Sequence, residues 1–135
     1  MLSMITYNSY TKMRSFVGLE KVLDSTLQVP YKAVILVDDS TDETLLVVRR
    51  WCDRSGKELV ASRSRLYSYH RPTRAVARQT AIDIFLESFS DEWLMFVDDD
   101  VVLLDGWWRW VDESGALEDP RVGEVWKQQK ETTTL

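Results

Sequence analysis

The chain has 135 residues, of which 44% are hydrophobic and 29% are charged, so a single folded domain with a packed core is expected. The formal net charge of -5 argues against a nucleic acid partner, because proteins bind nucleic acids largely by neutralising phosphates with lysine and arginine. The single cysteine, Cys52, excludes an internal disulfide bond and a thiolate metal cage, and no apolar run approaches the roughly 20 residues of a membrane span, so a cytoplasmic protein is expected.

The first third of the chain predicts two strands separated by a helix. Residues 1–6 are mostly apolar and predict a strand that ends in a polar loop. A helix that closes before Pro30 is predicted from apolar side chains at helical spacing, namely Phe16, Leu19, Val22, Leu23 and Leu27. Residues 33–37 are an unbroken apolar run, which is typical of a parallel strand covered on both faces.

The next elements are a helix and a weaker strand. Thr41 or Asp42 is predicted to cap the helix, and Ser55 and Gly56 are predicted to end it. Its inward side is predicted to contain Leu45, Val48 and Cys52, with Arg49 and Arg50 turned outward. Residues 58–62 predict the third strand.

The second half of the chain continues the alternation. Residues 63–74 form an irregular basic stretch, and residues 74–89 predict a helix. The inward side of this helix is predicted to contain Val76, Ala77, Thr80, Ala81, Ile84 and Phe85. Residues 93–97 predict a fully apolar strand, and residues 106–111 predict the start of another helix.

Strands that alternate with helices predict an α/β fold, with an open, mostly parallel, Rossmann-like sheet and helices on both faces. Ligands of such sheets bind outside the carboxyl ends of the strands. Three predicted strands end there in polar clusters, at residues 6–8, 38–40 and 98–100. The sequence therefore predicts a polar ligand site at this edge.

Consecutive carboxylates at a strand end need a counter-charge. Asp98, Asp99 and Asp100 place like charges close together, which is unfavourable unless cations neutralise them. Oxygen-rich clusters favour Mg²⁺ or Mn²⁺, and Mg²⁺ readily shares its shell between carboxylates and substrate phosphates. An isolated acidic turn is usually only a solvated strand end. The second pair, Asp38 and Asp39, at the end of another buried strand favours the ligand site.

Other residues near this edge are candidates for ligand contacts or for structural roles. Arg74 and Arg78 lie one turn apart at a helix start, and either could hold phosphate. Arg63 and Arg65 are predicted to form a solvated basic face. Tyr7 either stacks on a nucleobase or packs on its own loop. A tryptophan group is predicted to be mostly core, with one member free to line an acceptor groove: Trp107, Trp108 and Trp110.

In this order the motifs resemble those of family 2 glycosyltransferases, which have the GT-A fold. Residues 5–9 are similar to a T-Y-N-R strand end, and residues 23–28 to an S-L-L-x-Q helix end. Residues 37–44 are similar to V-D-D-G-S-T-D-G-T, although both glycines are absent. Further similarities are Ala77-Arg78-Gln79 to A-R-N, residues 96–100 to the strand that carries D-x-D, and Gly106-Trp107-Trp108 to P-G-W-L.

The resemblance implies a metal-dependent glycosyltransferase that takes a nucleotide diphosphate-sugar as donor, with UDP-sugars as the default and GDP- and dTDP-sugars next. It implies that Asp39 contacts the base edge and Asp38 supports the same loop. Asp98 or Asp99 would contact the ribose, and Asp98 and Asp100 would ligate Mn²⁺ or Mg²⁺. The predicted donor site as a whole consists of Thr6, Tyr7, Asn8, Asp38, Asp39, Arg74, Arg78, Asp98 and Asp99.

The acceptor side is less defined. Residues 1–135 are expected to form one nucleotide-sugar-binding domain, with a short or incomplete acceptor region after about residue 113. No residue stands out as the catalytic base, so inverting stereochemistry is a family expectation. The acceptor, a glycan, lipid or protein, is open, as is assembly into a homodimer. The alternatives are a non-catalytic nucleotide-sugar-binding module and a haloacid dehalogenase-like phosphatase.

Overall fold

The computed structural model describes residues 2–6, 18–67, 71–90 and 93–123. The strands of this part form one sheet in the order β3-β2-β1-β4, and every pairing between them is parallel. The strands are β1 (Leu2–Thr6), β2 (Ala33–Asp38), β3 (Glu58–Ser62) and β4 (Met95–Asp98). The predicted open parallel sheet is therefore confirmed.

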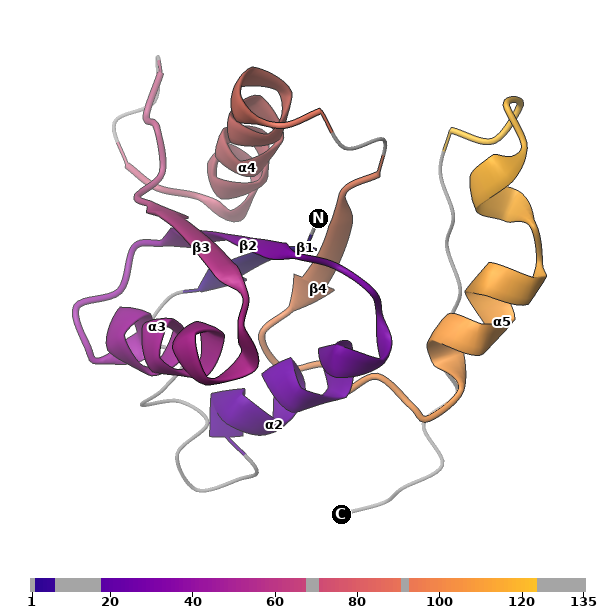
Figure 1. The fold of residues 1–135 in the computed structure, drawn as a ribbon. Coiled ribbons are helices and arrows are strands. Elements are labelled where there is room, and N and C mark those ends of the chain that lie inside the picture. Colours follow the sequence, from indigo (N-terminus) through magenta and orange to yellow (C-terminus); the bar gives the residue numbers. More distant parts are fainter. Residues whose placement is uncertain (1, 7–17, 68–70, 91–92, 124–135) are drawn as a thin grey trace.

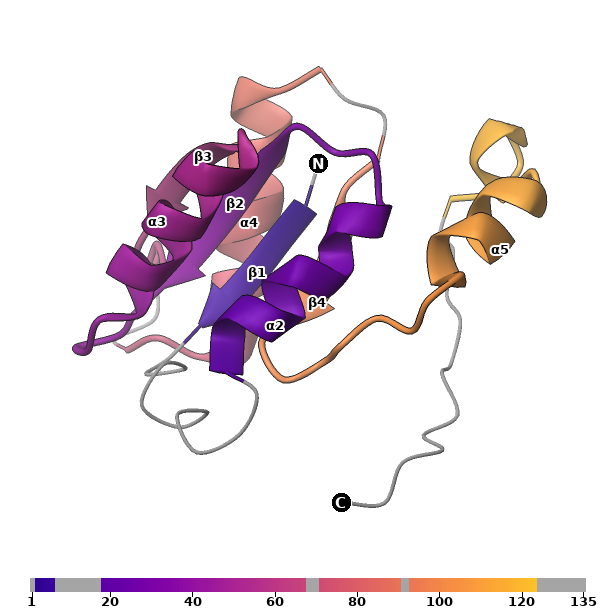
Figure 2. The same ribbon diagram turned by 60° about the horizontal axis from the view of Figure 1, so that its bottom comes forward.

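Helices cover both faces of this sheet, as predicted (Figures 1 and 2). One face is covered by α2 (Gly18–Ser25), which continues as the 3-10 helix η1 (Thr26–Gln28), and by α3 (Thr44–Ser55). The other face is covered by α4 (Arg74–Ser88). Both views place α5 (Trp107–Glu113) and the 3-10 helix η2 (Ala116–Glu118) to one side of these layers.

Strand β2 is the centre of the core because it has a neighbouring strand on each side and a helix layer on each face. Val34 and Leu36 join the apolar cluster of α2 and α3. Ile35 and Val37 join the cluster that α4 forms over the opposite face. All six residues of β2 are buried, which confirms the prediction from its unbroken apolar run.

The prediction for α3 holds at its end and on its inner side. Gly56 has φ 69, a left-handed conformation that favours glycine, and its N–H donates to the Cys52 carbonyl. Cys52 itself is 1% exposed, and burial raises the pKa of its thiol to about 11. It is a core residue, as predicted, and the thiol stays protonated at neutral pH.

Two apolar residues are more exposed than predicted. Leu27 is 48% exposed, because the chain tightens after α2 into a 3-10 turn and the helical spacing that pointed it inward no longer applies. The fourth strand spans Met95–Asp98 rather than 93–97, and Phe96 is 39% exposed because β4 is the last strand of the described sheet. The tryptophan group is mostly core, as predicted: Trp107 and Trp108 pack against the core, and Trp110 is 43% exposed.

Within the described ranges, no helix combines the length and the apolar character that crossing a bilayer requires.

Candidate functional site

The strand register brings the two acidic clusters to the same edge of the sheet. Thr6, the last residue of β1, pairs with Asp38, and Ile5 pairs with Asp98 on the other side of β1. Neighbouring strands lie about 4.8 Å apart, so the backbones at Asp38 and Asp98 are separated by only about two strand spacings. Residues from distant parts of the chain therefore meet around the end of β1.

This edge also contains the point where the strand order reverses. From β1 the chain builds outward through β2 and β3, and it then crosses to the opposite side of β1 to form β4. Because the connection now runs in the other direction, its helix α4 covers the opposite face. The carboxyl ends of β1 and β4 thus flank the crevice in which sheets of this kind bind ligands.

Asp38 organises the turn that follows β2. Its side chain is largely buried, and Oδ1 accepts hydrogen bonds from the Ser40 N–H, at 3.2 Å, and from the Ser40 hydroxyl. Two residues further on, Oδ1 of Asp42 accepts from the Thr44 N–H at 3.0 Å, so Asp42 bonds the start of α3. The turn is therefore held by its own carboxylates.

Asp39 is held from outside the turn, by Ser64. The Ser64 N–H donates to Oδ1 of Asp39 at 2.9 Å, and the Ser64 hydroxyl donates to Oδ2 at 2.6 Å. Both carboxylate oxygens are engaged and the pair is part-buried. No motif in the sequence pointed to Ser64, because the contact depends on the pairing of β2 with β3.

The Asp98–Asp100 cluster lies on a tight turn at the end of β4. The Val101 N–H donates to the Asp98 carbonyl at 3.2 Å, which closes the turn. An oxygen of Asp98 lies 3.5 Å from Nη2 of Arg78 on α4, and the Arg78 guanidinium is 5.8 Å from the centre of the Phe96 ring. Both partners are about half exposed, so this ion pair contributes little to stability.

The donor set is all oxygen, and it is incomplete as a metal site on its own. Asp98 and Asp100 are exposed carboxylates, which suit Mg²⁺ or Mn²⁺. Among the residues that the structure describes, no three His, Cys, Asp or Glu side chains converge to hold a cation. One or two carboxylates fit a cation that completes its shell with substrate phosphate.

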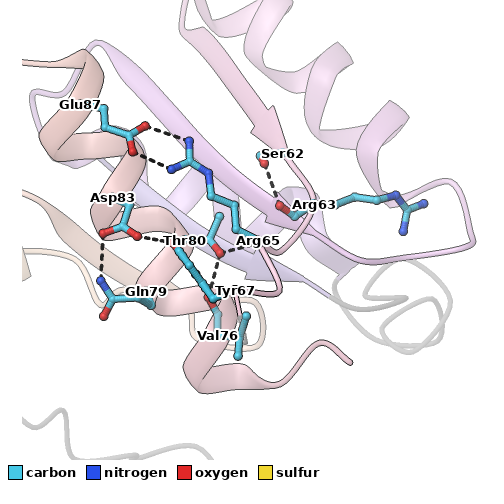
Figure 3. Close-up of polar contacts among 9 residues, drawn as sticks. All are labelled: Ser62, Arg63, Arg65, Tyr67, Val76, Gln79, Thr80, Asp83 and Glu87. Atoms are coloured by element: carbon cyan, nitrogen blue, oxygen red, sulfur yellow. Dashed lines mark hydrogen bonds and ion pairs between the residues drawn. The ribbon is translucent and has the colours of Figure 1, made fainter. Parts of the chain in front are cut away.

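The two arginines predicted to form a solvated face behave differently from each other. Arg65 makes a bidentate ion pair with Glu87, with Nη1 and Nη2 at 2.7 and 2.9 Å from the two carboxylate oxygens (Figure 3). Arg63 extends away from it, and its Nη2 donates to the Ser40 carbonyl at 3.3 Å. Arg63 is exposed and the Arg65 side chain is 39% exposed, so the solvated-face prediction holds, and each residue also has a partner that only the folded chain supplies.

A hollow of about 490 Å³ lies beside the acidic turn. It opens between the turn after β2, the start of α3 and the end of β3. The lining residues are Asp38, Ser40, Thr41, Asp42, Leu45, Arg49, Ala61, Ser62 and Arg63. Arg63 and Arg49 thus add positive charge at the carboxylate edge, a role that their sequence positions did not indicate.

The end of α2 holds the segment that follows the Asp98–Asp100 turn. The Ser25 hydroxyl accepts the Leu103 N–H at 3.0 Å. The Gln28 amide accepts the Trp108 N–H at 2.9 Å and donates to the Leu104 carbonyl at 3.1 Å. Between these contacts Gly106 has φ 85, so a left-handed residue sets the turn into α5. The sequence marked Ser25 and Gln28 only as part of a motif.

Replacing Gln28 with methionine is expected to destabilise the fold by about 1–2 kcal/mol, because three backbone groups lose a hydrogen bond while the side-chain length is kept. Urea denaturation measures this change. Gln79→Met is the matched control, since the Gln79 side chain makes an exposed hydrogen bond to Asp83 within α4, and a change below about 0.5 kcal/mol is expected there. Equal losses in the two variants would contradict the bridging role of Gln28.

Four further residues were predicted to belong to the site. Arg74 is exposed at the first turn of α4, and Asp99 is half-buried within the β4 turn. Tyr7 and Asn8 lie outside the described residues.

The fold and this edge define an open α/β protein with polar strand ends at the reversal of its strand order. The chain belongs to glycosyl transferase family 2, whose model matches residues 2–111. It is also similar to the crystal structure of S. aureus TarS, with 26% sequence identity and a TM-score of 0.50. This match covers 73% of the chain and 16% of TarS, so the chain corresponds to a small part of TarS.

Together with the parallel sheet and its two helix layers, these matches establish the GT-A fold predicted from the sequence. A comparison with curated proteins gave no significant match. The family match also decides against the haloacid dehalogenase alternative.

Proposed function

We propose that this chain is the donor-binding domain of a glycosyltransferase and that it binds a nucleotide diphosphate-sugar at the carboxyl edge of its sheet. The observation that carries the proposal is the register that sets Asp38 and Asp98 on either side of the end of β1, in a chain of glycosyl transferase family 2.

The nucleobase end of the proposed site is Asp39. A carboxylate only accepts hydrogen bonds when ionised, so it suits a base with an N–H donor at the centre of its pairing edge. Uracil, thymine and guanine have such a donor, whereas cytosine and adenine have an acceptor nitrogen at that position. This chemistry supports UDP-sugars as donors, with dTDP- and GDP-sugars as the next candidates. Tyr7 and Asn8 are proposed to line the same end.

The diphosphate end of the proposed site is the Asp98–Asp100 turn and the start of α4. Asp98 and Asp100 would hold Mn²⁺ or Mg²⁺, and Asp99 or Asp98 would bond the ribose. When bound, the cation supplies Lewis acid stabilisation of the departing nucleoside diphosphate. Arg78, which lies 3.5 Å from Asp98, and Arg74, one turn earlier on α4, would neutralise phosphate oxygens.

A thermal-shift screen of nucleoside diphosphates, with and without Mn²⁺, tests the proposal. Ligands that bind the native state raise its apparent stability. We expect UDP, dTDP or GDP to raise the melting temperature, with a larger rise when Mn²⁺ is present, and ADP and CDP to give smaller shifts. Mn²⁺ alone is the control. No shift with any nucleoside diphosphate at millimolar concentration would contradict the proposed function.

A further inference from the structure

The carboxylate of Asp39 is bonded to a residue of a different β-α connection. Ser64 follows β3, and it donates to both oxygens of Asp39, at 2.9 Å from its N–H and 2.6 Å from its hydroxyl. A carboxylate with one donor on each oxygen cannot rotate about its last torsion without breaking a bond. The carboxylate plane of Asp39 is therefore set by Ser64.

The segment that carries Ser64 is itself fastened to α4. On the C-terminal side of Ser64, the Arg65 N–H donates to the Thr80 hydroxyl at 2.9 Å, and the Arg65 guanidinium pairs with Glu87. The Tyr67 hydroxyl donates to Asp83, with Tyr67 in a left-handed conformation at φ 47 (Figure 3). The segment that carries Ser64 therefore cannot shift along α4 or move away from it without breaking these contacts.

On the other side of Ser64, Arg63 donates to the Ser40 carbonyl and so joins the segment to the turn after β2. The carboxylate of Asp39 thus lies in a frame that is anchored at both ends, on α4 and on its own turn. A rigid acceptor discriminates between bases better than a mobile one, because a mismatched edge cannot be accommodated by rotation.

We propose that Ser64 is a positioning residue that orients the Asp39 carboxylate and thereby sets which nucleobase the site accepts. This inference rests on the proposed function for its second half, whereas the orientation of Asp39 is independent of any ligand. Loss of the Ser64 hydroxyl frees Oδ2 of Asp39 while leaving the backbone N–H bond in place.

Calorimetric titration of UDP and CDP in Mn²⁺ tests the selectivity. Ser64→Ala is expected to lower the ratio of UDP to CDP affinity about tenfold, the effect of one hydrogen bond to a charged group. Ser64→Thr, which keeps the hydroxyl, is expected to restore the ratio to within about twofold, a small fraction of that effect. Ser114→Ala is the matched control, because Ser114 follows α5 and its hydroxyl bonds the Val111 carbonyl instead of Asp39, and it should leave the ratio unchanged.

A second measurement needs no nucleotide. Hydrogen exchange at the Ser64 amide is expected to be slow in the unaltered protein and about tenfold faster in Asp39→Ala, where the acceptor is removed. Equal exchange in both proteins would overturn the inference, as would an unchanged UDP to CDP ratio in Ser64→Ala. A third outcome is that the unaltered protein binds no UDP while exchange at the Ser64 amide still becomes faster in Asp39→Ala. That result would overturn the proposed function and the role of Ser64 in selectivity, and it would support the orienting contact alone.

Discussion

Asp100→Ala is expected to remove the gain in UDP affinity that Mn²⁺ provides, a loss of about tenfold to a hundredfold, while affinity in metal-free buffer stays the same. The reason is that Asp100 is an exposed carboxylate on the turn after β4, where it would share a cation with the diphosphate. Because the side chain is exposed, its removal should leave the fold intact. Calorimetric titration with and without Mn²⁺ measures both affinities.

The matched control is Asp53→Ala, which removes an exposed aspartate from α3 instead of from the carboxyl edge. It has the same effect on net charge, so it separates a specific ligand from a general loss of negative charge. The metal role of Asp100 would have to be abandoned if Asp100→Ala kept the full response to Mn²⁺, or if Asp53→Ala lost it equally.

Trp51→Ala is expected to destabilise the protein by about 3–5 kcal/mol, the largest effect on stability of any substitution considered. Trp51 is 1% exposed between α3 and α2, and its ring N–H donates to Asp24 at 2.8 Å. Truncation therefore removes a large apolar surface and leaves Asp24 without this donor. Urea denaturation at 25 °C gives the change in the free energy of unfolding.

Two further variants give the Trp51 experiment its internal standards. Trp110→Ala removes the same side chain from a position that is 43% exposed, and a loss below about 1.5 kcal/mol is expected. Trp51→Phe keeps most of the apolar surface and loses the N–H, so a destabilisation of about 1–2 kcal/mol is expected. This variant replaces Trp51→Ala in the comparison if Trp51→Ala does not fold. Similar losses at positions 51 and 110 would contradict the role of Trp51 as the link between α2 and α3.

Much of the core could have been predicted from the spacing alone, and Trp51 shows where the prediction was incomplete. Val48 and Cys52 were predicted to face inward and do. Trp51 follows Val48 at the same helical spacing and is buried with them, although it was not included. Leu45, which was included, is only half-buried. Periodicity thus indicated the face of the helix, and packing against α2 selected the residues on it that are fully covered.

At the carboxyl edge of the sheet, too, part of the candidate site could be predicted from the sequence and part depended on the tertiary structure. The positions of Asp38 and Asp98 at strand ends were predictable, because an apolar run that stops at carboxylates marks the end of a buried strand. Their approach to each other was also expected from the rule for parallel sheets. Which strands are neighbours was not, since the pairing of β1 with both β2 and β4 depends on contacts across the whole domain.

By itself, the sequence determined the parallel α/β class, the buried second strand and the two acidic strand ends, because hydrophobic periodicity and local turn chemistry act over a few residues. Only the tertiary structure decided the partners: Asp39 with Ser64, 25 residues apart, and Gln28 with Trp108, 80 residues apart. Such contacts arise from strand order and register. These depend on the free energy of the complete core, so they cannot be predicted from any short stretch of sequence.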